Sequence, residues 1–173
     1  MADTLVDSYW SWLHPLYPFL QKVAFKHQYA QLWSIEPHKS MEDRDYHDYW
    51  SHDLFNCILN LIFALGCQVS PSINAAQRSE AGDVFYQRSK AFIDFGSLDN
   101  GGVELVQALL LTGQYLQSTG KSGACWNVVG LAIRAAQGIG LHLNQYDSQQ
   151  GQTDQLEVET RRRLWGGCLL FDR

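Results

Sequence analysis

Charge is scarce in this sequence of 173 residues. Asp, Glu, Lys and Arg make up 18% of it, and the acidic residues outnumber the basic ones to give a net charge of −5. A surface that faces a phosphate backbone needs clustered basic residues, so this balance argues against a chain devoted to nucleic-acid binding. The hydrophobic fraction of 46% and the six tryptophans instead predict a folded domain with a sizeable core.

Closely spaced cysteines are also lacking. The chain has four, at Cys57, Cys67, Cys125 and Cys168, and none lies within four residues of another. Structural zinc sites bring cysteines in close pairs, so the spacing excludes the usual zinc motifs from this chain. Three of the four lie in apolar runs, which favours reduced, buried thiols in an intracellular protein, with disulfides as the alternative.

No apolar run is long enough to cross a bilayer, which takes about 20 residues. The most apolar segment spans Cys57 to Cys67, and it predicts a buried helix of a soluble protein without a membrane partner. The N-terminus carries Asp3 and Asp7 and has no basic region before a long apolar stretch, so it is not a secretory signal.

Catalytic motifs are missing as well. The sequence has no G-x-S-x-G elbow, no phosphate-binding loop and no dinucleotide fingerprint. A metal site is one hypothesis for the segment that holds Asp45, His47, Asp48, His52 and Asp53. The two histidines lie five residues apart, however, and not at the i, i+4 spacing that places two ligands on one helical face. We therefore predict a solvated capping segment there, no metal or other cofactor in this chain, and no enzyme.

Helical spacing of apolar residues recurs through the chain, whereas strict alternation is nearly absent. The pattern predicts an all-α fold of six to seven helices in one irregular domain over residues 1–173. Helices are expected over about 4–13, from 18, from 51 and over 81–95, followed by a helical hairpin from 103 to 142 and a final helix.

The second arm of the hairpin carries the clearest local signals. Trp126 is expected on its packed side, and two mid-helix glycines, Gly113 in the first arm and Gly130 in the second, are expected to allow close approach of the helices. Gly140 is placed for the left-handed cap position, with Leu141 in a Schellman arrangement. The letters WNVVGLAI resemble the start of a tetratricopeptide unit, but no second copy occurs at the required period.

The final helix carries three consecutive arginines, Arg161, Arg162 and Arg163. They spread over about 200° of the helix, so they cannot all face one phosphate track. Glu157 precedes Arg161 by four residues and Glu159 precedes Arg163 by four, which is the favourable order for helix ion pairs. The run therefore predicts a structural charge network, with direct contact to an effector or partner as the alternative.

Four positions of the same helix fall on one stripe: Trp165, Cys168, Leu169 and Asp172. Burial of Trp165 would make Trp165→Ala cost about 3–5 kcal/mol. A buried Asp172 would need a partner. Arg134 is the first candidate, and Arg173 or the arginine run are the others.

Four blocks together resemble a known family. They are LVDSYWSWLHPLYPFL (5–20), FNCILNLIFALG (55–66), VFYQRSKAFI (84–93) together with the hairpin from LVQALLL to GLHLN (105–144), and EVETRRRLWGGCLLFDR (157–173). The chain is similar to the fungal-specific transcription factor domain, the middle homology region of fungal binuclear zinc-cluster regulators of the xylanolytic-activator type. Gly166 stands where that family usually has a second tryptophan, and the family continues beyond Asp-Arg, so the resemblance implies a fragment truncated at its C-terminus.

The resemblance implies a regulatory domain that acts in transcription in the nucleus. It implies that zinc and DNA belong to a six-cysteine cluster outside this chain, and that a homodimer would form through a coiled coil also outside it. A small-molecule effector or a co-regulator protein is an implied partner. The alternative is a non-catalytic helical adaptor or repeat-type scaffold for protein interactions.

Overall fold

The computed structural model describes residues 1–33, 50–93, 101–143 and 155–173. These residues form an all-α fold with seven α-helices, as the sequence predicts. In chain order the helices are α1 (Ala2–Ser8), α2 (Lys22–Gln31), α3 (His52–Val69), α4 (Arg78–Ser89), α6 (Val103–Ser118), α7 (Ser122–Gly138) and α8 (Gln155–Phe171). A π-helical turn, Tyr9–Leu13, extends α1, and single 3-10 turns, Ala75–Gln77 and Lys90–Phe92, flank α4.

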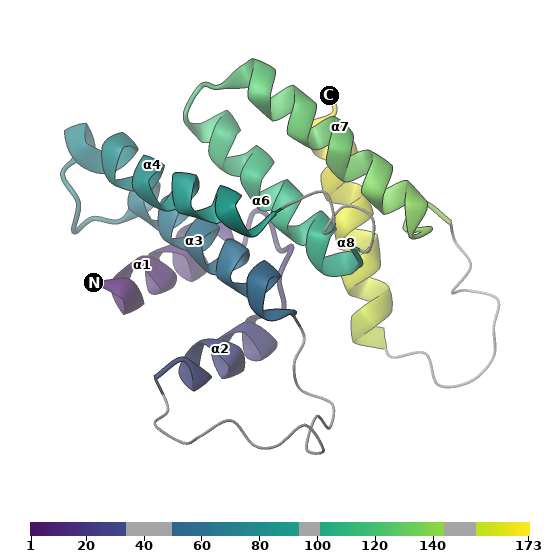
Figure 1. Cartoon of the computed structure of the whole chain (residues 1–173), viewed down its shortest axis with the longest axis horizontal. Coiled ribbons are helices and arrows are strands. Elements are labelled where there is room, and N and C mark those ends of the chain that lie inside the picture. The colour runs from purple at the N-terminus through teal and green to yellow at the C-terminus, as the bar shows by residue number, and fades with distance from the viewer. Residues whose placement is uncertain (34–49, 94–100, 144–154) are drawn as a thin grey trace.

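Helices α3 and α6 form the centre of the domain. Helix α3 packs against α1, α4 and α6, and α6 packs against α7 and α8. Figure 1 shows α6 and α7 as an antiparallel hairpin with α8 crossing behind it, and α2 at the lower edge of the molecule. Because both central helices are covered by neighbours, they carry most of the fully buried side chains.

The apolar run from Cys57 to Cys67 lies within α3, which begins where the sequence predicts. Ser51 Oγ accepts a hydrogen bond from the Leu54 N–H at 3.4 Å and caps the helix. By length and composition α3 could cross a membrane, the one such helix in the described part of the chain, but 61% of its apolar window is buried inside the fold. A core helix passes the same test, so the finding is weak evidence for a membrane.

The helices approach one another most closely at glycines. A Cβ atom at Gly66 of α3 would collide with the backbone of Leu5 in α1, and one at Gly82 of α4 would lie 3.1 Å from the carbonyl oxygen of Ala64 in α3. A side chain at either position would push two helices apart. Helices α1 and α4 therefore pack on α3 with a close approach of their backbones at these two glycines.

Helix α2 begins at Lys22, four residues later than the sequence predicts. Residues 14–20 turn the chain instead, and the Nε2 atom of His14 lies 2.9 Å from the carbonyl oxygen of Leu20, at hydrogen-bonding distance. Phe19 and Leu20 are buried in this turn. Tertiary packing of these two side chains therefore outweighs the preference of Pro18 for the first turn of a helix.

Candidate functional site

Helix α7 ends in a left-handed cap at Gly140, whose φ is 71°. The Gly140 N–H donates to the Gln137 carbonyl at 3.0 Å, and the Leu141 N–H donates to the Ala136 carbonyl at 2.9 Å. This pair of bonds is the Schellman arrangement expected for Gly140 and Leu141. Leu141 is buried, so the cap turns the chain back onto the core.

Arg161 joins this cap to α8. Its guanidinium donates to the carbonyl oxygen of Ile139 at 2.9 Å, and its side chain is only 16% exposed. A carboxylate oxygen of Glu157 lies 3.9 Å from the guanidinium. Because the last carbonyls of a helix lack partners within the helix, a half-buried arginine here satisfies one of them and joins α8 to the end of α7.

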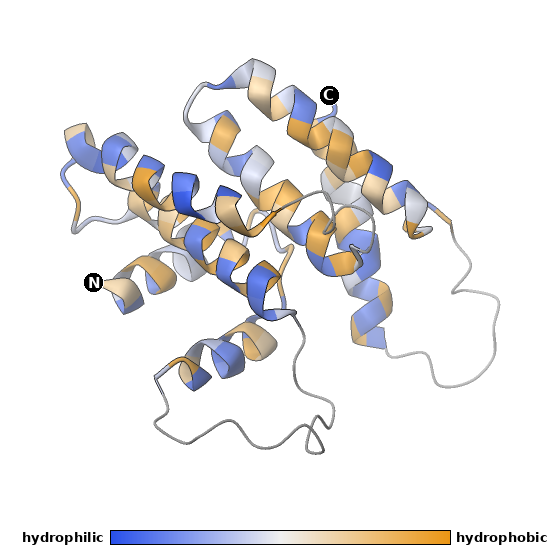
Figure 2. Cartoon of the chain, in the orientation of Figure 1, coloured by the Kyte–Doolittle hydropathy of each residue, from blue (hydrophilic) through white to orange (hydrophobic). Residues whose placement is uncertain are grey.

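The other two arginines of the run turn back onto their own helix. Arg162 and Arg163 both donate to the carboxylate of Glu159, with Arg163 at 2.7 Å. Hydrogen bonds from Arg163 and Arg162 lower the pKa of Glu159. Figure 2 shows the hydrophilic residues that gather in the N-terminal half of α8. All three arginines therefore already have a carboxylate partner on α8, and direct contact of the run with an effector or partner stays a prediction.

The buried stripe of α8 differs from the predicted one. Leu164, Gly167 and Cys168 are the buried residues of its C-terminal half, whereas Leu169 is 46% exposed. A Cβ atom at Gly167 would collide with the ring of Phe19 and lie 3.3 Å from Leu110 Cδ1. The helix is thus rotated so that Leu164, Gly167 and Cys168, and not Trp165 and Leu169, face the core.

That rotation corrects two predictions. Trp165 is half-buried, with its ring 5.8 Å from the ring of His142, and is not a core residue. Asp172 is exposed and so needs no buried partner. Arg134 and Arg173 are exposed too, and the described residues include no ion pair between Asp172 and either arginine.

The predicted packing of α7 is also wrong at two residues. Trp126 is 75% exposed. A Cβ atom at Gly130 would meet nothing within 4 Å, so this glycine does not mark a close approach. The close approach predicted at Gly113 of α6 is confirmed, because a Cβ atom there would lie 3.2 Å from Val129 Cγ2. Helical periodicity alone placed Trp126 on the packed side, but α6 and α8 leave that flank of α7 open.

The metal hypothesis finds no support in the described residues. Asp45, His47 and Asp48 lie outside them. His52 and Asp53 are adjacent and exposed, 3.6 Å apart, and no three His, Cys, Asp or Glu side chains in the described part of the chain lie close enough to hold a metal ion. All four cysteines are free, and burial raises the pKa of Cys57 to about 12 and of Cys168 to about 11.

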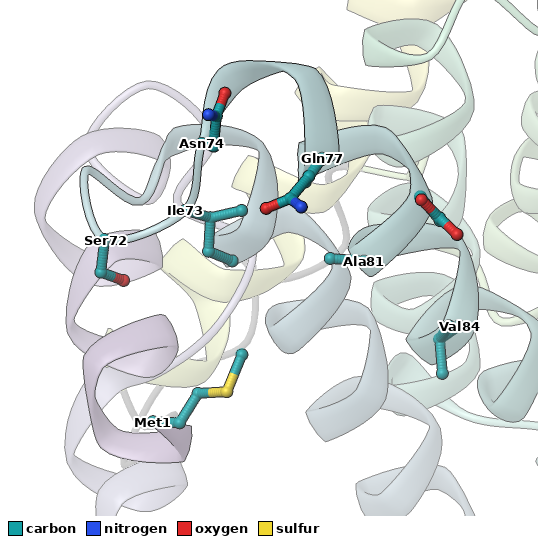
Figure 3. Close-up of a pocket in the computed structure, with 8 residues that line it drawn as sticks. Met1, Ser72, Ile73, Asn74, Gln77, Ala81 and Val84 are labelled. Carbon is teal, nitrogen blue, oxygen red and sulfur yellow. The ribbon is translucent and has the colours of Figure 1, made fainter.

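A shallow hollow of about 380 Å³ lies between the N-terminus of α1 and the start of α4 (Figure 3). Apolar and uncharged polar side chains dominate its lining, which consists of Met1, Ser72, Ile73, Asn74, Gln77, Glu80, Ala81 and Val84. Glu80 is the single ionisable side chain among them. The hydroxyl of Ser72 is hydrogen-bonded to that of Ser70 at 2.8 Å and not to a base, so the lining shows neither an activated nucleophile nor a pair of acid and base side chains.

Comparison with known proteins identifies the domain. The family described as the fungal specific transcription factor domain matches residues 6–173. The chain belongs to this family. The match begins at Val6 in α1 and runs to Arg173, so it covers all four blocks except Leu5.

Curated relatives of this fungal transcription factor domain are transcription regulators. A transcription factor of the sorbicillinoid biosynthetic cluster of Penicillium rubens is 31% identical over 99% of the chain and 24% of its own length. The nitrogen assimilation transcription factor nirA of Emericella nidulans is 29% identical over 100% of the chain and 18% of its own length. A lactose regulatory protein of Kluyveromyces lactis is 27% identical over 92% of the chain and 16% of its own length. The chain thus spans a quarter or less of these relatives, and no solved structure matches it.

The fold brings the first and last blocks of the family domain together. The rings of Tyr17 and Phe171 stack at 5.5 Å, and Gln21 donates to the Thr160 hydroxyl at 3.1 Å. Phe19 meets Gly167 between them. Residues more than 130 positions apart in the sequence therefore form one packed seam.

Sequence reasoning missed the buried Gln107, which ties this seam to the core of the family domain. Its Oε1 accepts from Trp50 Nε1 at 2.7 Å, and its Nε2 donates to the Phe19 carbonyl at 2.9 Å. A glutamine inside the apolar run VELVQALLL is the one signal that could have identified it, because a buried amide needs partners.

Proposed function

We propose that this chain is the regulatory domain of a fungal transcription factor and controls how strongly that factor activates or represses its genes. The observation that carries the proposal is the family match over residues 6–173. The names of the curated relatives support it, because each is a transcription factor or regulator.

DNA contact belongs, in this proposal, to a zinc-cluster domain elsewhere in the full-length protein, which acts in the nucleus. The charge of the chain supports this division of labour. The net charge is −5, Arg162 and Arg163 are paired with Glu159, and Arg161 is directed into the α7 cap. The surface of α8 therefore lacks the unpaired basic track that a phosphate backbone requires.

An in-frame deletion of the codons for residues 1–173 from the native gene tests the proposal. Chromatin immunoprecipitation should find the shortened factor still at its promoters, while the transcripts of the adjacent genes change. A matched control carries Gly166→Ala, at an exposed position with nothing within 4 Å of the added atom, and should behave as the unaltered gene.

Two outcomes would contradict the proposal. Unchanged transcripts after the deletion would mean that the domain has no regulatory role. Absence of the full-length protein from every promoter would favour the helical adaptor instead.

A further inference from the structure

Helix α2 is attached to the domain through very few side chains. Phe25 and Gln28 are its buried residues, whereas Val23 is 84% exposed. A helix of 10 residues is marginal by itself in water, so α2 depends on what these two side chains contact.

Phe25 fills a pocket made of aromatic rings. Its ring centre lies 5.5 Å from that of Trp10, 5.6 Å from that of Phe55 and 6.5 Å from that of Trp50. Phe25 is fully buried there, and Tyr29 of the same helix stacks on it at 5.9 Å. Three polar contacts accompany it: Gln28 Nε2 donates to the Trp50 carbonyl at 3.1 Å, the Tyr29 hydroxyl donates to Asp3 at 2.8 Å, and the Lys22 ammonium lies 5.7 Å from the centre of the Trp10 ring. The docking of α2 is therefore centred on one aromatic side chain in an aromatic pocket.

The walls of this pocket also make contacts that do not involve α2. Trp50 donates its indole N–H to Gln107 of α6. Phe55 belongs to α3, the capped central helix, and the ring of Trp10 packs against His14 at 4.3 Å. These contacts would remain if α2 moved away, whereas the bond from Gln28 to the Trp50 carbonyl and the contact of Lys22 with the Trp10 ring would be lost.

Helix α2 also fits the pocket incompletely. The indole N–H of Trp10 and the side-chain oxygen of Gln28 are buried and have no hydrogen-bond partner among the described residues. Trp10 is only 4% exposed. Unpaired buried polar atoms weaken a contact, and a different occupant with a suitably placed acceptor would bind better.

We propose that α2 can be displaced from the rest of the domain by a competing peptide. The pocket of Trp10, Trp50 and Phe55 is a docking site for a partner peptide that offers an aromatic side chain and a hydrogen-bond acceptor for the indole of Trp10. Phe25 occupies this site in the structure and keeps it closed until such a peptide competes. The inference does not depend on the role in transcription, because it concerns this chain alone.

Hydrogen exchange on the unaltered chain tests whether α2 detaches from the domain without a partner peptide. Amides of residues 22–31 should exchange at least about tenfold faster than those of 58–66 in α3 and 105–116 in α6, since local opening needs less free energy than global unfolding. Equal protection of all three segments would overturn the proposal, because α2 would then leave only when the whole domain unfolds.

Competition with a synthetic peptide tests the pocket. A fluorescent peptide of residues 20–32 should bind the Phe25→Ala chain at least about tenfold more tightly than the unaltered chain, in which the tethered α2 competes at high effective concentration. The same peptide with Phe25→Ala should not bind, and a chain with Val23→Ala should behave as the unaltered one. Equal affinity for the Phe25→Ala and unaltered chains, binding of the altered peptide, or no binding to a Phe25→Ala chain whose α3 and α6 stay protected would overturn the proposal.

Discussion

Arg161 differs from its two neighbours because its guanidinium lies between two helices. Its side chain is 16% exposed, against 78% for Arg162, and it donates to a carbonyl of another helix. Loss of a charged donor would leave the Ile139 carbonyl without that bond, so Arg161→Ala should lower the free energy of unfolding by about 1.5–3 kcal/mol. Urea denaturation measures this change.

Arg162→Ala is the matched control for that measurement. It removes an exposed ion pair with Glu159, which contributes less than about 1 kcal/mol. If the two variants unfolded at the same urea concentration, the guanidinium of Arg161 would not join α7 to α8.

The stability of the folded state is expected to depend on pH through His14. Burial lowers the pKa of His14, the neighbouring charges of Lys22 and Arg163 add to this, and the hydrogen bond to Leu20 opposes it. Below about pH 6.5 the unfolded chain then binds more protons at this residue than the folded chain does, so acid favours unfolding. We expect the contribution of His14 to stability to be full above pH 6.5 and to be lost as the pH falls toward the lowered pKa.

The variant His14→Gln isolates that contribution. Urea unfolding midpoints at pH 7.5 and pH 5 should differ less in the variant than in the unaltered chain. Parallel pH profiles for the two proteins would contradict the assignment to His14.

Alanine substitutions at two adjacent glycines of α8 are expected to change the stability of the fold in opposite directions. A Cβ atom at Gly167 would collide with Phe19 in the packed seam, whereas one at Gly166 would meet nothing within 4 Å. Gly167→Ala should therefore destabilise the fold by about 1–3 kcal/mol. Gly166→Ala should stabilise it by up to about 1 kcal/mol, because alanine is the better helix former.

Thermal denaturation of the two variants measures these effects side by side. Both changes add one methyl group to the same helix. If one variant is stabilised and the other destabilised, the difference reports the packing of α8 against Phe19. A stabilised Gly167→Ala variant would mean that α8 does not pack against Phe19 in solution.

For the whole molecule, we expect the isolated chain not to bind duplex DNA with sequence specificity. The net charge is −5, and Arg162 and Arg163 are paired on their own helix. Gel-shift titration against a pool of random duplexes, at low and at physiological salt, checks this expectation. Enrichment of one sequence from the pool would place a DNA-binding site in this chain and contradict the proposed division of labour.

The all-α class, the start of α3 at Ser51 and the cap at Gly140 could be predicted from the sequence, because each depends on local chemistry. Periodicity, a capping hydroxyl and a glycine at the end of a helix act within a few residues of one another. The four sequence blocks likewise identified the family without any structure.

The tertiary structure alone decided which face of each helix is buried. Helical spacing permits several apolar stripes, and in α8 the collision that a side chain at Gly167 would cause with Phe19 selects one of them. That choice leaves Asp172 in solvent and Trp165 half-buried. In the same way Trp126 is exposed because α6 packs on another side of α7. The aromatic pocket under Phe25 joins Trp10 to Trp50 and Phe55 at the start of α3, and contacts between distant segments leave no mark on local periodicity.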